Sequence, residues 1–279
     1  MATLPCSERF SGESILVTRS VGQSDTFVQQ LREKGAQAIA LPALEIQPPS
    51  TWAFLDQQLF RLTAFDWLIF TSANGVEFFM ARFQAQGYSR QDWATAALKI
   101  AVVGQKTAAH LNTYGLTPDF IPPQFISDSL VEHFPDREHL SGMQILYPCL
   151  EDDRREQVIS DLTQLGAKVI DVPAYRSACP TAIAPDVLNT LKQGVDVVTF
   201  ASPKTARCFQ QLLKTYQVEL GASLEQLLAS VAIASIGPLT STTCHEIFGR
   251  VDIQPDEYSL NGLTSALITW SAAQATREP

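Results

Sequence analysis

Two polar turns in the chain follow apolar runs and precede segments with helical spacing. Ser72-Ala73-Asn74-Gly75 follows Trp67 to Phe70, and Ser202-Pro203-Lys204 follows Val197 to Phe200. The first backbone N–H groups of a helix have no partner within the helix, and together with the positive end of the helix dipole they can bind anions. These turns therefore predict binding of a negatively charged ligand, and the simpler alternative is a plain strand-to-helix connection.

Two other apolar runs end in a glycine that is followed three residues later by a threonine. The pairs are Gly104 with Thr107 and Gly237 with Thr240. A hydroxyl at the start of a helix can cap the free N–H groups or bind an oxygen of a ligand. The sequence leaves both roles open for these threonines and for the serines of the two turns above.

The segments around these turns recur in the two halves of the chain in the same order. Each copy alternates apolar runs of strand length with helical segments, which is typical of an α/β domain with a doubly wound, flavodoxin-like, mainly parallel sheet. The sequence therefore predicts two similar domains from an internal repeat. The matched segments are 15–19 with 145–149, 35–45 with 166–176, 65–72 with 195–202, 99–111 with 231–243, and 118–130 with 251–263.

Ligands of doubly wound sheets bind outside the carboxyl ends of the strands. The turns of each copy should gather at that edge, and turns from two domains that face one another would line an interdomain cleft. We expect these turns after Arg19, Phe70, Val103, Leu146, Phe200 and Ile236.

Two proline-flanked stretches, Leu41 to Pro49 and Val172 to Pro180, differ from the strands of a compact sheet. Proline is tolerated at sheet edges and disfavoured in central strands. We therefore expect the two stretches to pair as an antiparallel, two-stranded β-ladder that links the domains. The repeat alone leaves open whether each strand-helix unit stays with its own copy or crosses to the other.

The composition excludes several classes of partner. A net charge of −9 argues against nucleic acid or an anionic membrane as ligand, because both need a basic surface. Hydrophobic residues make up 46% of the chain, yet no apolar run approaches the roughly 20 residues of a membrane helix. We therefore expect a globular protein that is cytoplasmic, or plastid-like if a transit segment has been removed.

The sequence carries no recognisable metal or nucleotide motif. Histidines show no metal-ligand spacing, and both the dinucleotide and the P-loop glycine patterns are absent, so we expect no cofactor and no metal. The cysteines are odd in number and widely spaced, which favours reduced thiols. They are Cys6, Cys149, Cys179, Cys208 and Cys244.

Taken together in their order and duplication, these segments resemble the uroporphyrinogen-III synthase family. The resemblance extends from about Ile15 to Leu267. The segments that carry it are "FTSANGV" with "FASPKTA", "VGQKTA" with "IGPLT", and "VPAYRS".

The resemblance implies a monomeric, cofactor-free lyase of tetrapyrrole biosynthesis. Its substrate would be hydroxymethylbilane, a linear tetrapyrrole that carries many carboxylates and is handed over by hydroxymethylbilane synthase. The enzyme would remove water, invert ring D and close the ring to uroporphyrinogen III. The implied domains are 1–42 with 180–279 and, separately, 48–172, with linker strands at 43–47 and 173–179.

The resemblance also assigns roles to individual residues. It places the most important tyrosine of the family at Tyr175, where a phenol of ordinary pKa about 10 can donate a proton to the leaving hydroxyl. The alternative is a linker tyrosine packed against a domain edge. The expected substrate-binding residues are Arg19, Ser72, Ala73, Asn74, Gly75, Gly104, Thr107, Ser202, Pro203, Lys204, Gly237 and Thr240.

One segment departs from the family pattern. Members often carry a basic residue or glycines after the strand that matches Ile145 to Pro148, and here Cys149-Leu150-Glu151-Asp152-Asp153 follows instead. We therefore do not expect this turn to bind carboxylates, although Arg154 and Arg155 could compensate if they are not merely a solvated charge cluster. The alternative function is a two-lobed protein that binds or senses a small anion without chemistry.

Overall fold

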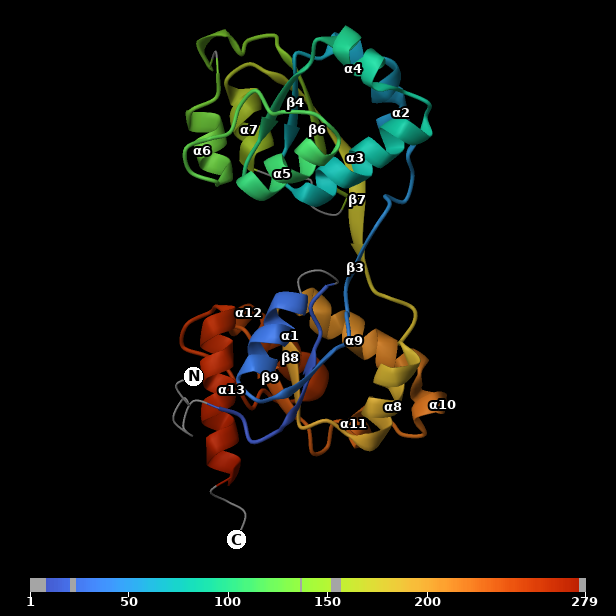
Figure 1. The fold of residues 1–279 in the computed structure, drawn as a ribbon, viewed down its shortest axis with the longest axis vertical. Coiled ribbons are helices and arrows are strands. Elements are labelled where there is room, and N and C mark those ends of the chain that lie inside the picture. The colour runs from blue at the N-terminus through green and yellow to red at the C-terminus, as the bar shows by residue number, and fades with distance from the viewer. Residues whose placement is uncertain (1–8, 21–23, 136, 152–156, 276–279) are drawn as a thin grey trace. The chain divides into compact units, whose positions relative to one another are not determined.

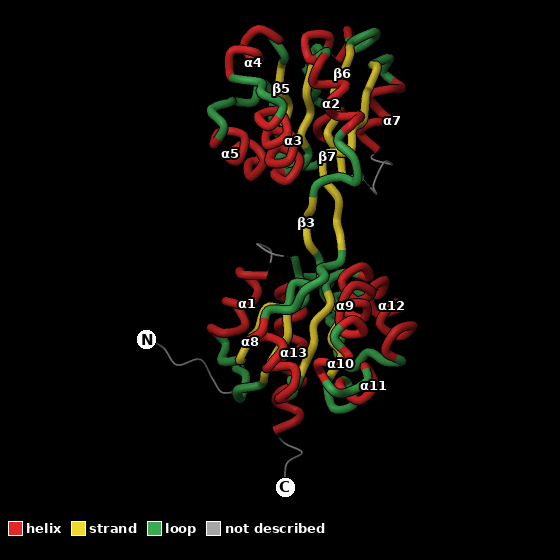
Figure 2. Tube along the Cα trace, turned by 90° about the vertical axis from the view of Figure 1, so that its right-hand side faces the viewer, coloured by secondary structure: helices red, strands yellow, loops and turns green. Residues whose placement is uncertain are grey.

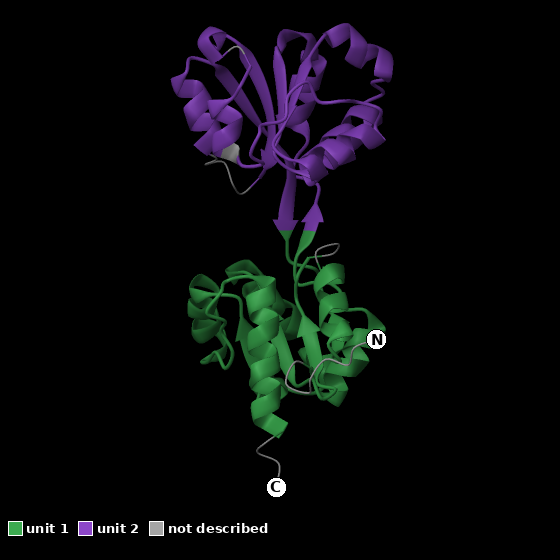
Figure 3. Ribbon diagram, turned by 60° about the vertical axis from the view of Figure 1, so that its left-hand side comes forward, with its two compact units in different colours: residues 1–45, 178–279 green, residues 46–177 purple. Residues whose placement is uncertain are grey.

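The computed structural model describes residues 9–20, 24–135, 137–151 and 157–275. It divides into two compact units, residues 1–45 with 178–279 and residues 46–177 (Figure 3). The N-terminal segment thus folds with the C-terminal part of the chain, a point that the repeat left open. Cys6, Arg154 and Arg155 lie outside the described residues.

The first unit, residues 1–45 with 178–279, contains a four-stranded sheet in the order β2-β1-β8-β9. All three strand pairs are parallel. Every residue of β8 and β9 is buried, as expected for parallel strands that are covered on both faces. The strands are β1 (Ser14–Val17), β2 (Gln37–Ala40), β8 (Val197–Phe200) and β9 (Ala232–Ser235).

Two groups of helices cover this sheet (Figure 1). On one face, α1 (Ser24–Glu33) and α13 (Leu260–Ala275) pack against Ile15, Val17 and Val197. The other face is covered by α8 (Pro185–Gln193), α9 (Pro203–Thr215), α10 (Gln217–Leu220), α11 (Leu224–Leu227) and α12 (Pro238–Phe248).

The second unit, residues 46–177, contains a five-stranded sheet in the order β3-β7-β6-β4-β5. Strand β4 is parallel to β5 and β6, and β6 is parallel to β7. The predicted α/β class with parallel sheets is confirmed. The strands are β3 (Glu45–Gln47), β4 (Trp67–Phe70), β5 (Lys99–Val102), β6 (Gln144–Leu150) and β7 (Lys168–Ala178).

Helices also lie on both faces of the second sheet, as Figure 2 shows for each unit. One face is covered by α2 (Ala53–Phe60), the short turn η2 (Leu62–Ala64), α3 (Ala73–Ala85), α4 (Arg90–Ala96) and α5 (Gln105–Thr113). The other is covered by α6 (Ser127–Glu132) and α7 (Gln157–Gln164), with η3 (Arg137–His139) beside them.

Strand β7 differs from the sequence-based expectation. It runs without a break through residues predicted to lie apart from the compact sheet, and it pairs with β6 up to Leu150 and Tyr175, with an irregularity between Cys149 and Leu150. Strand β6 likewise continues past the turn expected after Leu146. Pro148 is tolerated because the register of β6 with β4 ends at Leu146, so the missing N–H lies beyond that pairing.

The cysteine prediction is wrong at two positions. Cys179 and Cys208 form a disulfide with a Cα–Cα distance of 4.9 Å, whereas Cys149 and Cys244 are free and buried. The segment after β7 carries Cys179 against helix α9, which holds Cys208. Because 29 positions separate the two cysteines, their spacing carried no sequence signal for this contact.

Candidate functional site

Ser72 is the N-cap residue of helix α3 and lies two positions after the end of strand β4. The extended backbone of Ser72 directs its Oγ to the backbone N–H of Gly75, which donates a hydrogen bond of 3.0 Å. Of the two roles that the sequence left open, the structure gives this hydroxyl the capping role. Ala73 and Asn74 are half-buried in the first turn, and Gly75 is buried.

Tyr175 lies beside this helix start. Its hydroxyl oxygen is 2.9 Å from Ser72 Oγ, and either oxygen can donate the hydrogen bond. The Tyr175 ring stacks on Phe78 of α3, with the ring centroids 6.2 Å apart and 20° between the ring planes. The phenol is thus positioned by two side chains of one helix.

A backbone hydrogen bond also holds Tyr175 in place. The N–H of Glu151 donates a 2.8 Å hydrogen bond to the Tyr175 carbonyl, which continues the pairing of β6 with β7. Next to it, Arg176 donates to Gln47 Oε1 of β3 at 3.2 Å. Tyr175 is therefore a sheet residue of the second unit, and it is half-buried.

Glu151, the residue after β6, makes its contacts within the protein. The carboxylate of Glu151 accepts hydrogen bonds from the backbone N–H of Ser50 at 3.0 and 3.2 Å and from its hydroxyl. This carboxylate therefore fixes the chain before α2.

Gly104 is the N-cap residue of helix α5, at the carboxyl end of β5. Gly104 is half-buried, and Thr107 in the first turn is only 4% exposed. The Thr107 side chain is thus inside the unit, and the exposed residues of this turn are Gln105 and Lys106.

The turn after β8 in the first unit has the same chemistry as the turn at Ser72. Ser202 caps helix α9 by accepting from the N–H of Thr205 at 3.2 Å, and Pro203 is the first residue of that helix. Ser202, Pro203 and Lys204 are all half-buried. At the end of β9, Gly237 begins helix α12, and Thr240 is 3% exposed.

Arg19 follows strand β1 by two residues and is half-buried. Its carbonyl accepts a 2.6 Å hydrogen bond from the hydroxyl of Ser24 at the start of α1. Burial lowers the pKa of the Arg19 guanidinium from its ordinary value. An arginine remains charged in proteins nonetheless, so this partly desolvated cation favours an anionic ligand.

The structure thus brings the predicted residues together in two sets, one in each unit. In the second unit, Tyr175 joins the turn at Ser72, and Gly104 begins a helix at the carboxyl end of neighbouring strand β5. In the first unit, Arg19, Ser202 and Gly237 follow three adjacent parallel strands. The sequence analysis missed Phe78 because that residue lies off the apolar face of its helix, and only its contact with Tyr175 reveals it.

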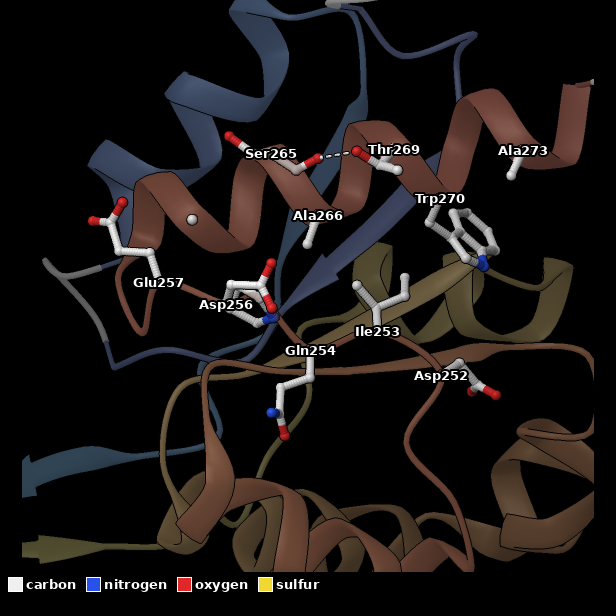
Figure 4. Close-up of a pocket in the computed structure, with 12 residues that line it drawn as sticks. Asp252, Ile253, Gln254, Asp256, Glu257, Ser265, Ala266, Thr269, Trp270 and Ala273 are labelled. Carbon is white, nitrogen blue, oxygen red and sulfur yellow. Dashed lines mark hydrogen bonds between the residues drawn. The ribbon is translucent and has the colours of Figure 1, made fainter.

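A pocket of about 600 Å³ lies elsewhere, between helix α13 and the loop 252–257 of the first unit (Figure 4). None of the predicted binding residues lines it. Its Asp252 carboxylate accepts from the N–H of Ile233 at 2.8 Å and from Arg250 Nε at 3.1 Å, so this group is part of the fold.

The described residues contain neither a cluster of metal-ligating side chains nor a membrane-spanning helix. Nowhere among them do three or more His, Cys, Asp or Glu side chains lie close enough together to hold a metal ion. In the same part of the chain, no helix combines the length and apolar character needed to cross a membrane.

Solved structures with the same fold are known. A uroporphyrinogen-III synthetase from Helicobacter pylori superimposes with a TM-score of 0.52 over 95% of this chain and 100% of that one, at 16% identity. A mutant uroporphyrinogen III synthase from Thermus thermophilus gives a TM-score of 0.50 over the same shares, at 18% identity. At these identities the likeness concerns the fold alone.

Sequence comparison gives closer relationships. The family described as uroporphyrinogen-III synthase HemD matches residues 25–265. The uroporphyrinogen-III synthase of Synechococcus elongatus is 46% identical over 93% of this chain and 96% of its own length. A putative uroporphyrinogen-III synthase of Methanothermobacter thermautotrophicus is 29% identical over 90% of this chain. The chain therefore belongs to the uroporphyrinogen-III synthase family.

Proposed function

We propose that this protein is a uroporphyrinogen-III synthase, a lyase that cyclises hydroxymethylbilane with loss of water and inversion of ring D. The relationship to the synthase of Synechococcus elongatus, 46% identical over nearly the whole of both chains, carries this assignment. The product, uroporphyrinogen III, is the precursor of the biological tetrapyrroles.

Binding of the substrate must overcome the net charge of −9 of the protein. We assign this task to the helix starts at Ser72, Gly104, Ser202 and Gly237, which offer backbone N–H groups and positive dipole ends to carboxylates. Arg19 adds a partly desolvated cation. Ala73, Asn74, Gly75, Pro203 and Lys204 complete the proposed set, and Thr107 and Thr240 belong to it through their turns, because their side chains are buried.

Tyr175 is the proposed acid. As the bond between the terminal methylene carbon and its hydroxyl breaks, the adjacent pyrrole nitrogen supplies electrons, and the phenol proton leaves with the hydroxyl as water. Ring closure later releases a proton, which restores the phenol. Ser72 and Phe78 support this role because they fix the Tyr175 ring and its hydroxyl.

We also propose that the two units are copies of one ancestral flavodoxin-like domain. When the matched segments of the two halves are aligned, the strand order β2-β1-β8-β9 of the first sheet corresponds to the order β7-β6-β4-β5 in the second sheet. This correspondence supports the duplication. The proposed domains are 1–42 with 180–279 and 48–172. The proposed antiparallel linker strands are 43–47 and 173–179, although the observed units divide after Glu45 and Ser177 because β7 continues in the sheet.

Sequence resemblance suggests a cytoplasmic monomer that receives its substrate from hydroxymethylbilane synthase.

The decisive experiment generates hydroxymethylbilane in situ with hydroxymethylbilane synthase and adds the purified protein without metal or nucleotide. After oxidation, the porphyrin isomers are separated by chromatography. We expect the type III isomer, whereas the control without this protein gives the symmetrical type I isomer. Type I alone in both samples would contradict the assignment and favour a two-lobed anion-binding protein.

A further inference from the structure

In each unit, one segment returns to an edge strand of the sheet. This segment follows β9 in the first unit and β5 in the second. Phe120 forms a bridge to Ala101 of β5, and Ile253 forms the matching bridge to Ala234 of β9. In both units, the residue before the bridging residue is an aspartate whose carboxylate accepts a hydrogen bond from a backbone N–H of the edge strand. Asp119 accepts from the N–H of Ile100, and Asp252 from that of Ile233, both at 2.8 Å.

Five residues after each bridge, an aromatic side chain lies against the glycine that begins the next helix. A Cβ placed on Gly104 would lie 3.7 Å from Phe125 Cβ, and one on Gly237 would lie 3.1 and 3.2 Å from ring carbons of Tyr258. Phe125 is 55% exposed and Tyr258 is 60% exposed. Both units therefore present an aromatic ring to solvent at the same place relative to the sheet.

The glycine at position 237 is explained by this ring. Its φ of 172° is extended backbone that any residue can adopt, so conformation does not require glycine there. A Cβ at this position would crowd the Tyr258 ring, and the glycine leaves room for the ring to lie close to the backbone. The loop is thus built to hold the ring at the start of α12.

Further apolar side chains are exposed at the same two turns. Ile126 follows Phe125 and is 52% exposed, and Leu239 in the first turn of α12 is 81% exposed. Solvent-exposed aromatic and aliphatic side chains next to free helix N–H groups suit a ligand that is flat and apolar on its faces and anionic at its rim.

We propose that Phe125 and Tyr258 bind pyrrole rings of the tetrapyrrole, each at the turn of its own unit. The inference rests on the proposed function, which supplies a substrate of linked pyrroles bearing carboxylates. The aromatic side chain packs against a pyrrole ring, and the neighbouring backbone N–H groups of α5 or α12 bind a carboxylate on the rim of that ring. These residues are binding residues and take no part in proton transfer.

The test measures equilibrium binding of uroporphyrinogen III under anaerobic conditions for the parent protein and for Phe125→Leu, Tyr258→Leu and Tyr258→Phe. Aromatic pairing predicts a dissociation constant about 2- to 12-fold higher for each leucine variant. Tyr258→Phe keeps the ring and should bind like the parent. Phe60→Leu is the matched control, because Phe60 is 89% exposed on α2 and lies outside the proposed site.

The same variants are assayed with hydroxymethylbilane. We expect KM to rise by a similar factor while kcat changes little, and urea denaturation should give unfolding midpoints near that of the parent. If the parent makes the type III isomer and the leucine variants bind uroporphyrinogen III as tightly as Phe60→Leu, the inference is overturned and the proposed function stands. If the parent neither binds uroporphyrinogen III nor forms the type III isomer, both are overturned.

Discussion

The hydroxyl oxygen of Tyr175 lies 2.9 Å from Ser72 Oγ, although 103 positions separate the two residues. The same Oγ accepts the 3.0 Å hydrogen bond from the N–H of Gly75. The start of helix α3 and the phenol of strand β7 therefore form one hydrogen-bonded chain. We therefore expect removal of either hydroxyl to change the position of the other.

Tyr175→Phe tests the acid role. Loss of a positioned acid typically lowers a rate by about 10² to 10⁴. We expect kcat to fall by a factor in this range while the affinity for uroporphyrinogen III stays near that of the parent, because the ring and its stacking on Phe78 remain. Activity should not vanish, because the pyrrole nitrogen can expel hydroxide unaided. An initial rate equal to that of the parent would make Tyr175 a packing residue only.

Ser72→Ala and Ser202→Ala separate capping from catalysis. Each serine caps a thirteen-residue helix, so each substitution should lower the free energy of unfolding by about 0.5–2 kcal/mol. Only Ser72 also bonds to Tyr175, and loss of one hydrogen bond of about 1 kcal/mol corresponds to roughly 5-fold in rate. We therefore expect kcat to fall more for Ser72→Ala. Equal kcat values in the two variants would argue against a positioning role for Ser72.

The Cys179–Cys208 disulfide should stabilise the first unit. A bridge between cysteines 29 positions apart limits the unfolded chain, and such bridges typically contribute about 2–4 kcal/mol. Urea denaturation of the parent with and without dithiothreitol should show this difference. The variant with Cys179→Ser and Cys208→Ser is the control, and reductant should not change its midpoint. A parent midpoint that is insensitive to reductant would contradict the prediction.

Asp56 provides a pH-dependent prediction for the second unit. Arg82 donates to both of its carboxylate oxygens, at 2.7 and 2.6 Å, and these bonds hold the pKa of Asp56 below its ordinary value. The folded state therefore favours the carboxylate, so the stabilisation is present at neutral pH and is lost as the pH falls below about 4 and through the lowered pKa.

The measurement is the free energy of unfolding at pH 7 and pH 3. Asp56→Asn should cost about 1 kcal/mol at pH 7, because the pair is only partly buried, and less at pH 3. Glu246→Gln is the control, because its pair with Arg207 is exposed and should contribute little at either pH. A cost for Asp56→Asn that does not depend on pH would contradict the predicted linkage.

Much of the secondary structure could be predicted because it depends on neighbouring residues. Trp67 to Phe70 is apolar at every position and forms the buried strand β4, and the helical spacing after it forms α3. The prediction that the stretch 172–180 lies apart from the sheet was based on Pro173 and Pro180, and it is wrong for the residues in β7. A proline disfavours a central strand only where its N–H is needed, and the pairing that decides this is not visible in the sequence.

The sequence by itself determined most of the order of strands, turns and helices, because this order depends on neighbouring residues. It offered the serines before α3 and α9 either as caps or as ligand-binding groups, and the structure shows them as caps. Tertiary structure alone decided that β1 pairs with β8, that Cys179 meets Cys208, and that Tyr175 meets Ser72. The buried strands are similarly apolar, so composition does not select their partners. Pairing is selected when whole strands and helices pack, and only then do distant side chains come within bonding distance.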